Sequence, residues 1–166
     1  MILGFQGKNP IIDERSFVAQ NATIIGEVII KKYASIWYNV VLRGDIAPIE
    51  IGESTSIQDG SIIHGDVGVP TIVGNKVTVG HKVILHACKI GDHCLIGMGA
   101  IVLNKAEVGE GAIIGAGAVV TPRTKIPAHT MSLGIPAKVV RNLTEEEVEG
   151  LKKRALRYVE LIKKYK

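Results

Sequence analysis

The chain has 166 residues, a formal net charge of +4, 19 glycines and only 4% aromatic residues. This length fits one domain with a short appendage, and the composition favours short strands and turns over a helical bundle. The stretch 152–166 alternates basic and apolar residues, which predicts a solvated helix face and no nucleic-acid partner. No run approaches the roughly 18 apolar residues of a membrane span, and the first ten residues lack a signal-peptide core. We therefore expect a cytoplasmic protein without a membrane partner.

A six-residue repeat runs through most of the chain. Its longest unbroken series of apolar positions is Ile90, Ile96, Val102, Val108, Ile114, Val120 and Ile126. A small residue follows four positions after most of them, and shorter runs of the same repeat begin at Val18, Ile51 and Val73. This period suits a short strand plus a corner, repeated as a solenoid. With three hexads per coil, the sequence predicts a triangular cross-section and about six coils spaced by about 4.8 Å.

The repeat defines the expected domain organisation. We expect a β-helix domain over residues 1–137, with repeats from about 17 to 127, and a C-terminal linker and helix over 138–166. The regular spacing breaks after Leu42, Ile63 and Leu85, where loops or a deletion would interrupt the winding.

The C-terminal segment carries the pattern of a capped amphipathic helix. Thr144 and Glu147 have the spacing of a capping box. An apolar stripe follows, formed by Val148, Leu151, Ala155, Val159 and Ile162. Such a stripe needs a surface to cover, so we expect this helix to pack on the solenoid.

Three histidines lie at defined phases of the repeat. Counting hexads as successive sides of the coil places Arg43, His64 and His86 on one side, so their side chains should form a stack. His64 and His86 would then lie one coil apart, close enough to converge on one ion. His81 falls on a different side of the coil. A threefold axis could bring a neighbouring subunit's His81 to the pair, with bonds of about 2.0–2.1 Å and an open position for water.

Five segments around these positions carry a family resemblance: Arg43-Gly44-Asp45, Ile57-Gln58-Asp59-Gly60, Ile63-His64, Val79-Gly80-His81 and Leu85-His86. In this order they resemble the γ-class carbonic anhydrases and their close homologues. The resemblance implies an all-β solenoid, the left-handed parallel β-helix of hexapeptide-repeat proteins, followed by a C-terminal α-helix. It also implies a homotrimer with metal sites between subunits.

The resemblance further assigns roles to the site residues. The metal ligands correspond to His64, His81 and His86, with zinc as the expected ion, although three imidazoles also suit Fe, Co or Ni. Metal-bound hydroxide would hydrate carbon dioxide reversibly to bicarbonate, the reaction of a carbonate dehydratase-type lyase. The other active-site residues correspond to Arg43 and Asp45 as an interface pair, to Gln58 and Asp59, and to Tyr158 on the C-terminal helix.

The chain departs from the fully active members of this family near the first histidine. The segment 65–70 is short, and Asp66 is its only acidic residue. Ile46 follows Asp45 where those members carry a glutamate. Without an acidic proton shuttle, activity is expected to be low or dependent on buffer.

Two other functions remain open on the sequence. One is a hexapeptide-repeat acyltransferase that uses acyl-CoA, because the exit segment 134–138 is shared with such enzymes. The other is a non-catalytic metal-binding homologue. The sequence also leaves open any redox role of Cys88 and Cys94, which we expect to be buried small residues.

Overall fold

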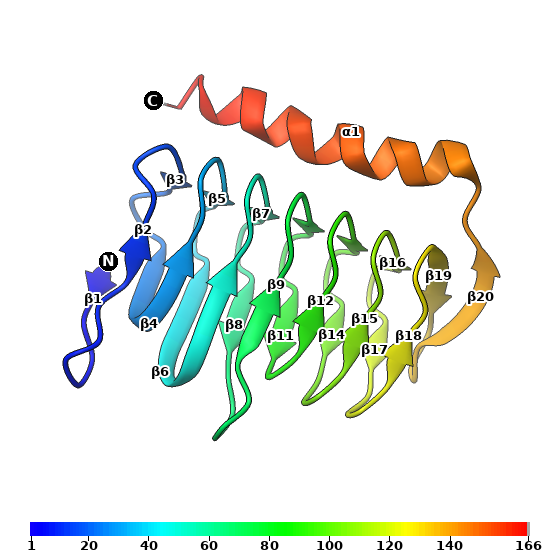
Figure 1. Ribbon diagram of the computed structural model, residues 1–166, viewed down its shortest axis with the longest axis horizontal. Helices are drawn as coiled ribbons and strands as arrows, with labels where there is room; N and C mark the ends of the chain where they lie inside the picture. The colour runs from blue at the N-terminus through cyan, green and yellow to red at the C-terminus, as the bar shows by residue number, and fades with distance from the viewer. Residues whose placement is uncertain (166) are drawn as a thin grey trace.

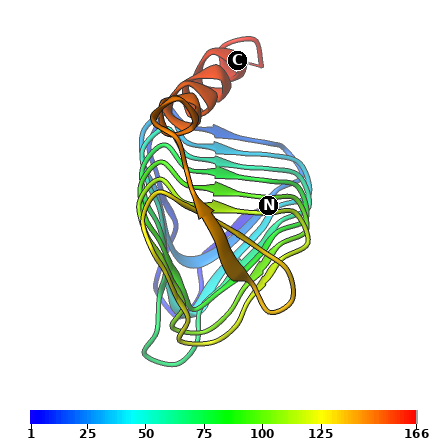
Figure 2. The same cartoon turned by 90° about the vertical axis from the view of Figure 1, so that its right-hand side faces the viewer.

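The computed structural model describes residues 1–165 as a parallel β-solenoid with one C-terminal helix. Figure 1 shows the coils stacked along the long axis, with helix α1 (Glu145–Ile162) running back over them. Viewed end on, the coils are roughly triangular and α1 lies along one corner of the prism (Figure 2). The predicted fold class, a hexapeptide-repeat solenoid with a C-terminal α-helix, is confirmed.

One side of the prism, which we call the helix side, is a sheet of eight strands. All but the last run parallel, one for each coil: β3 (Phe17–Val18), β5 (Ser35–Ile36), β7 (Ser56–Ile57), β10 (Thr78–Val79), β13 (Leu95–Ile96), β16 (Ile113–Ile114) and β19 (Thr130–Leu133). The winding therefore continues one coil beyond the repeat that the sequence predicts. Ser132 pairs with Ile114 and is fully buried. The apolar repeat in the sequence ends one coil too early because a serine occupies this inward position.

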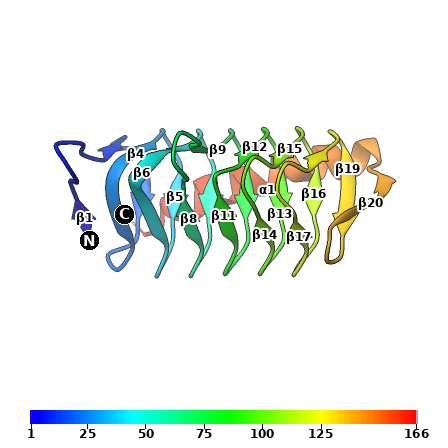
Figure 3. The same ribbon diagram turned by 90° about the horizontal axis from the view of Figure 1, so that it is seen from below.

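A sheet of twelve strands forms the other two sides. The apolar side carries β8 (Ile62–His64), β11 (Ile84–His86), β14 (Ile101–Val102) and β17 (Val119–Val120). The charged side carries β9 (Thr71–Val73), β12 (Lys89–Ile90), β15 (Glu107–Val108) and β18 (Lys125–Ile126). Two long strands, β4 (Thr23–Ile30) and β6 (Val41–Ile51), span both sides, and β1 (Ile2–Leu3) and β2 (Ile11–Ile12) pair with β4. Figure 3 shows strands of successive coils lying side by side.

Strand β6 passes from the apolar side to the charged side without a loop. Its first residues pair with β8 and its last with β9. The nine-residue interval after Leu42, where a loop is predicted to interrupt the winding, is therefore continuous strand. Gly44 permits the close approach of β4 and β6 there, because an added Cβ would lie 2.5 Å from the Glu27 carbonyl oxygen. The next interval, 65–70, does form a loop, which two backbone hydrogen bonds close.

The inward residues of the hexads form one apolar core along the axis. Large side chains such as Ile63 and Leu85 are fully buried, and small ones such as Ala100 and Ala106 lie where the interior narrows. Removing each large side chain from water contributes about 1.5–3 kcal/mol to folding. Because the coils pair in register, equivalent residues of successive coils lie side by side. The outward residue that follows a buried position therefore lies beside its counterpart in the next coil.

Helix α1 follows β20 (Lys138–Asn142), an antiparallel strand that pairs with β19. The predicted capping box is confirmed: Thr144 Oγ1 accepts a hydrogen bond from the Glu147 amide, and the Glu147 carboxylate accepts one from the Thr144 amide. Leu151, Ala155 and Ile162 of the apolar stripe are buried. In residues 1–165 the structure has no helix that is both long and apolar enough to span a membrane.

The end of α1 packs on the first coils of the helix side. Phe17, Ala19, Trp37 and Ile162 form a second apolar cluster, joined by Tyr158 and others. Trp37 Nε1 donates hydrogen bonds to two serine hydroxyls of the sheet. The helix predicted to cover the solenoid therefore does so within its own chain, and it brings Tyr158 to the solenoid surface.

Candidate functional site

The predicted stack of Arg43, His64 and His86 is confirmed by strand register. Arg43 pairs with His64 between β6 and β8, and His64 pairs with His86 between β8 and β11. The three residues lie where the apolar side meets the charged side. His64 Nδ1 lies 3.2 Å from His86 Nε2. The buried residues that precede them therefore place two imidazole nitrogens face to face.

Each ring of this pair is held at its other nitrogen by a side-chain oxygen. His64 Nε2 lies 3.0 Å from Asp45 Oδ1, and His86 Nδ1 lies 2.8 Å from Asn104 Oδ1. An oxygen accepts, so these two ring nitrogens donate. In neutral rings the nitrogens that face each other then both carry lone pairs, an arrangement that a cation between them would relieve.

Asp45 links the histidine pair to Arg43. Arg43 Nη1 donates to Asp45 Oδ2 at 2.7 Å within the same chain. The two residues predicted as an interface pair thus contact each other within one chain. Burial raises the pKa of Asp45, but hydrogen bonds from Arg43 and His64 outweigh it and hold the pKa below its ordinary value. Asp45 is therefore a carboxylate that accepts from both neighbours.

His81 lies at the opposite edge of the apolar side, in the corner between β10 and β11. Its Nδ1 lies 2.9 Å from Asp59 Oδ2, so the structure brings these two predicted site residues together. Both side chains are nearly half exposed, 49% for His81 and 43% for Asp59. The second ring nitrogen of His81, Nε2, takes no part in this contact.

A pocket of about 200 Å³ opens beside His81. Gln58, Asp59 and Tyr158 line it, together with Trp37, Tyr38, Leu161 and Tyr165. Gln58 is 5% exposed and its Nε2 donates to Tyr158 Oη, which joins the solenoid to α1. Four predicted site residues, Gln58, Asp59, His81 and Tyr158, therefore meet at one place.

The predicted residues thus form two half-sites. The paired-histidine half-site contains Arg43, Asp45, His64 and His86; the single-histidine half-site contains Gln58, Asp59, His81 and Tyr158. The half-sites lie at opposite edges of the apolar side. Among residues 1–165 of one chain, no three histidine, cysteine, aspartate or glutamate side chains are grouped as metal ligands.

Sequence reasoning did not single out Asn104. It lies in the turn after β14, two residues beyond Val102, which pairs with Leu85 just before His86. The register extended by one coil predicts which polar side chains lie over His86, and Asn104 is among them. The hexad search missed it because asparagine at a solenoid corner is also an ordinary turn residue.

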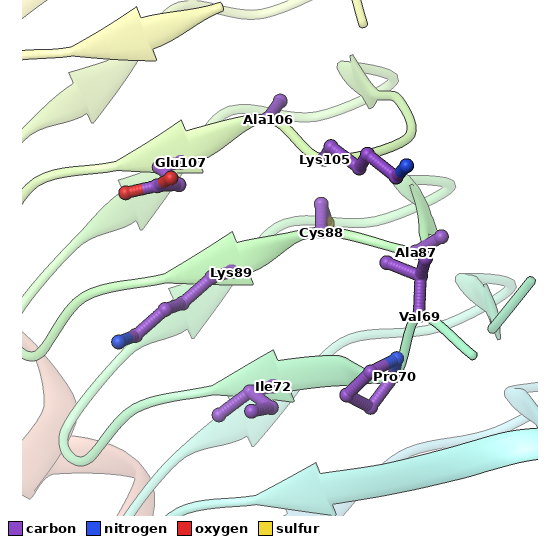
Figure 4. Close-up of a pocket in the computed structure, with 9 residues that line it drawn as sticks. All are labelled: Val69, Pro70, Ile72, Ala87, Cys88, Lys89, Lys105, Ala106 and Glu107. Atoms are coloured by element: carbon purple, nitrogen blue, oxygen red, sulfur yellow. The ribbon is translucent and has the colours of Figure 1, made fainter. Parts of the chain in front are cut away.

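A larger groove of about 340 Å³ lies along the charged side (Figure 4). It is lined by Val69, Pro70, Ile72, Ala87, Cys88, Lys89, Lys105, Ala106 and Glu107. These include none of the predicted site residues. Burial raises the pKa of the Cys88 thiol to about 12, so this thiol is not a nucleophile at neutral pH.

Known proteins share this repeat and much of this sequence. The family model described as bacterial transferase hexapeptide (six repeats) matches residues 87–122. A protein of Geobacillus kaustophilus named carbonic anhydrase is 49% identical over 166 residues, which are 100% of this chain and 91% of that protein. Gamma carbonic anhydrase 2, mitochondrial, of Arabidopsis thaliana is 41% identical over 161 residues, 93% of this chain and 58% of the plant protein.

A solved structure extends the likeness to the whole fold. The crystal structure of a hexapeptide transferase family protein from Anaplasma phagocytophilum matches with a TM-score of 0.97 at 42% identity. The match covers 100% of this chain and 98% of that one. On its sequence and its fold, the chain belongs to the γ-class carbonic anhydrase-like family of hexapeptide-repeat proteins.

Proposed function

We propose that the protein is a metal-dependent homotrimer of the γ-carbonic anhydrase type that interconverts carbon dioxide and bicarbonate. One observation carries the proposal: each of the three histidines has one ring nitrogen within 3.0 Å of a side-chain oxygen, from Asp45, Asp59 or Asn104. Metal-binding histidines nearly always donate their second N–H to such a partner. We place the protein in the cytoplasm, where its two free, buried cysteines would stay reduced.

The spacing of the paired nitrogens fits a tetrahedral metal ion. Bonds of about 2.0–2.1 Å in a tetrahedron separate two ligand nitrogens by about 3.3 Å. His64 Nδ1 and His86 Nε2 are 3.2 Å apart. We propose zinc, although Fe, Co and Ni also accept imidazole ligands. The ion would supply a Lewis acid that lowers the pKa of water toward neutrality.

The apolar side supports assembly as a trimer. Its outward residues form a ladder in register: Val41, Ile62, Ile84, Ile101 and Val119. Ile62 is 46% exposed and Ile84 is 37% exposed. An apolar strip of this kind, exposed at Ile62 and Ile84 and half-buried at its other positions, is typical of an interface. Three copies that turn this side toward a threefold axis would bring the edge with His81 of one subunit beside the paired-histidine edge of the next.

The remaining residues of the two half-sites would position reactants. Gln58 Nε2 donates to Tyr158, which leaves Gln58 Oε1 to accept a hydrogen bond from water and orient it. Asp45 and Asp59 hold their histidine rings. Asp66 is the only acidic residue in the loop 65–70, so we expect proton release to depend on external buffer.

Mixed trimers test whether the site is shared between chains. His64→Ala and His81→Ala chains would each lose the metal when assembled alone, because every site then lacks one ligand. In an equal mixture, about a quarter of the sites would join an intact pair to an intact third ligand. Bound metal, by elemental analysis, and carbon dioxide hydration, by stopped flow, should recover to about that fraction. The control mixture, His64→Ala with His86→Ala, should recover neither, and recovery absent from both mixtures would contradict the shared site.

An acyl-CoA-dependent transferase is the second candidate, because the solved structure at 42% identity bears a transferase family name. Such an enzyme needs one histidine as a general base and no metal triad. Titration with acetyl-CoA and with Zn²⁺ separates the two: we expect Zn²⁺ to bind and acetyl-CoA not to bind. Bound metal without hydration under any buffer, redox or metal condition would instead indicate a non-catalytic homologue.

A further inference from the structure

We infer that Asn104 is a positioning residue for His86, and that Asp66 determines which end of the Asn104 amide faces the ring. The inference rests on the proposed function, because it concerns the nitrogen that His86 offers to a metal. Asn104 Oδ1 lies 2.8 Å from His86 Nδ1, and Asn104 Nδ2 donates to Asp66 Oδ2 at 2.7 Å. These contacts connect three successive coils, since Asp66 precedes His86 by one coil and Asn104 follows it by one.

The chemistry of the three groups allows one arrangement of protons. An asparagine amide can present either its oxygen or its NH₂ group to a neighbour, but a carboxylate only accepts. The Asp66 carboxylate therefore takes the NH₂ group and leaves the oxygen of Asn104 to face His86. An oxygen there requires His86 to carry its proton on Nδ1. His86 Nε2 then keeps its lone pair and directs it toward His64.

The opposite orientation of the amide would remove the metal-binding nitrogen. Asn104 Nδ2 would then donate to His86 Nδ1, and the ring proton would move to Nε2. That proton would point at His64 and occupy the place of the ion. A charge-assisted hydrogen bond to Asp66 opposes this reversal, and such bonds are about twice as strong as those between neutral groups.

Asp66 itself is fixed by its loop. Its Oδ1 accepts from the Val67 amide at 2.8 Å, while its Oδ2 accepts from Asn104. Backbone hydrogen bonds in both directions between Asp66 and Val69 close the turn. Both carboxylate oxygens thus have set partners. Asp66 therefore orients a ligand, and this role is separate from any transfer of protons.

Exchange of the two side chains is the sharpest test. Asn104→Leu should lower Zn²⁺ affinity about 10- to 100-fold, the usual effect of losing a partner behind a ligand. Asp66→Asn should also lower it, because two amides facing each other no longer fix the orientation. Adding Asn104→Asp to Asp66→Asn should restore affinity to within about threefold, because the carboxylate now accepts from both the ring and the new amide. If the contact were merely structural, the losses of Zn²⁺ affinity caused by the two substitutions would instead add.

Asn75→Leu is the matched control. Asn75 also pairs with an aspartate, Asp92, at a solenoid corner, but neither residue contacts a candidate ligand. Its loss should lower stability and leave the Zn²⁺ affinity of the folded protein unchanged. An equal loss of affinity in both asparagine variants would overturn the inference.

An experiment on the metal-free protein tests this inference separately from the proposed function. Nitrogen-15 NMR should show the His86 proton on Nδ1 in the unsubstituted chain and a shift toward Nε2 in Asn104→Leu. A proton on Nε2 in the unsubstituted chain would overturn the inference. The expected tautomer in a protein that binds no Zn²⁺ would leave the positioning role standing and contradict the proposed function.

Discussion

The two half-sites differ in how firmly a single chain holds them. In the paired-histidine half-site, His64 is 16% exposed and lies against Asp45, which is itself bound by Arg43. In the single-histidine half-site, His81 is 49% exposed and its partner Asp59 is 43% exposed. One chain therefore holds two of the candidate ligands in place, whereas in the proposed trimer the third would be ordered by a neighbour.

The difference follows from the elements that carry each half-site. The paired histidines continue strands whose preceding residues, Ile63 and Leu85, are fully buried and paired in register. His81 lies in a corner, and the pocket beside it depends on how α1 docks through Tyr158. Core packing supports the first half-site, whereas helix docking and assembly would support the second.

Disrupting the apolar side should have the largest effect, because the half-sites then cannot meet. Ile101→Glu introduces a charge into the ladder one coil beyond His86, without touching either half-site. We expect light scattering to show monomers, and metal binding to fall at least about 100-fold through the loss of one ligand. Ile72→Glu, an outward position on the charged side, should remain trimeric with its metal. A metal-loaded monomer of Ile101→Glu would contradict the comparison.

Removing the carboxylate of each half-site should sharpen the contrast between them. Asp45→Leu leaves the N–H of a largely buried ring unpaired and should lower Zn²⁺ affinity about 10- to 100-fold. Asp59→Leu should lower Zn²⁺ affinity less than about tenfold, because water can replace the lost carboxylate as the partner of an exposed ring. Zn²⁺ titration of both variants measures the difference. Asp13→Leu, which breaks a surface pair with Arg15, is the control and should leave affinity unchanged.

Loss of one hydroxyl on α1 should have a smaller effect. Tyr158→Phe removes the acceptor of the Gln58 amide, a hydrogen bond that contributes about 1 kcal/mol. We expect kcat for carbon dioxide hydration to fall by up to about tenfold with metal content unchanged. Tyr33→Phe, whose ring lies under the Arg15 guanidinium and lines neither half-site, should leave kcat as it is. Equal kcat values in the two variants would remove Tyr158 from the site.

The smallest effect is expected for a thiol reagent, which should react hardly at all with the folded protein. Burial raises the pKa of both Cys88 and Cys94 to about 12, so at pH 8 the thiolate fraction is about one in ten thousand. A thiol reagent should label neither cysteine in the native protein and both after denaturation. Because Cys88 lies two residues beyond His86, fast native labelling of Cys88 alone would show that the paired-histidine corner opens.

The six-residue period predicted most of the fold from the sequence. The residue after a buried hexad position lies beside its equivalent in the next coil, so the stack of Arg43, His64 and His86 could be predicted without coordinates. The same count placed His81 on another side. The seventh coil escaped prediction because buried Ser132 does not match an apolar pattern.

The sequence by itself thus determined the winding, the capped helix and the side of the coil on which each candidate ligand lies, because a repeat in register converts position along the chain into position in space. Only the tertiary structure decided which groups contact those ligands. Asp45 reaches His64 because β6 continues from the apolar side to the charged side without a loop, and Asn104 reaches His86 from the next coil. Such contacts depend on corner shape and side-chain rotamers, which a pattern of apolar residues does not encode.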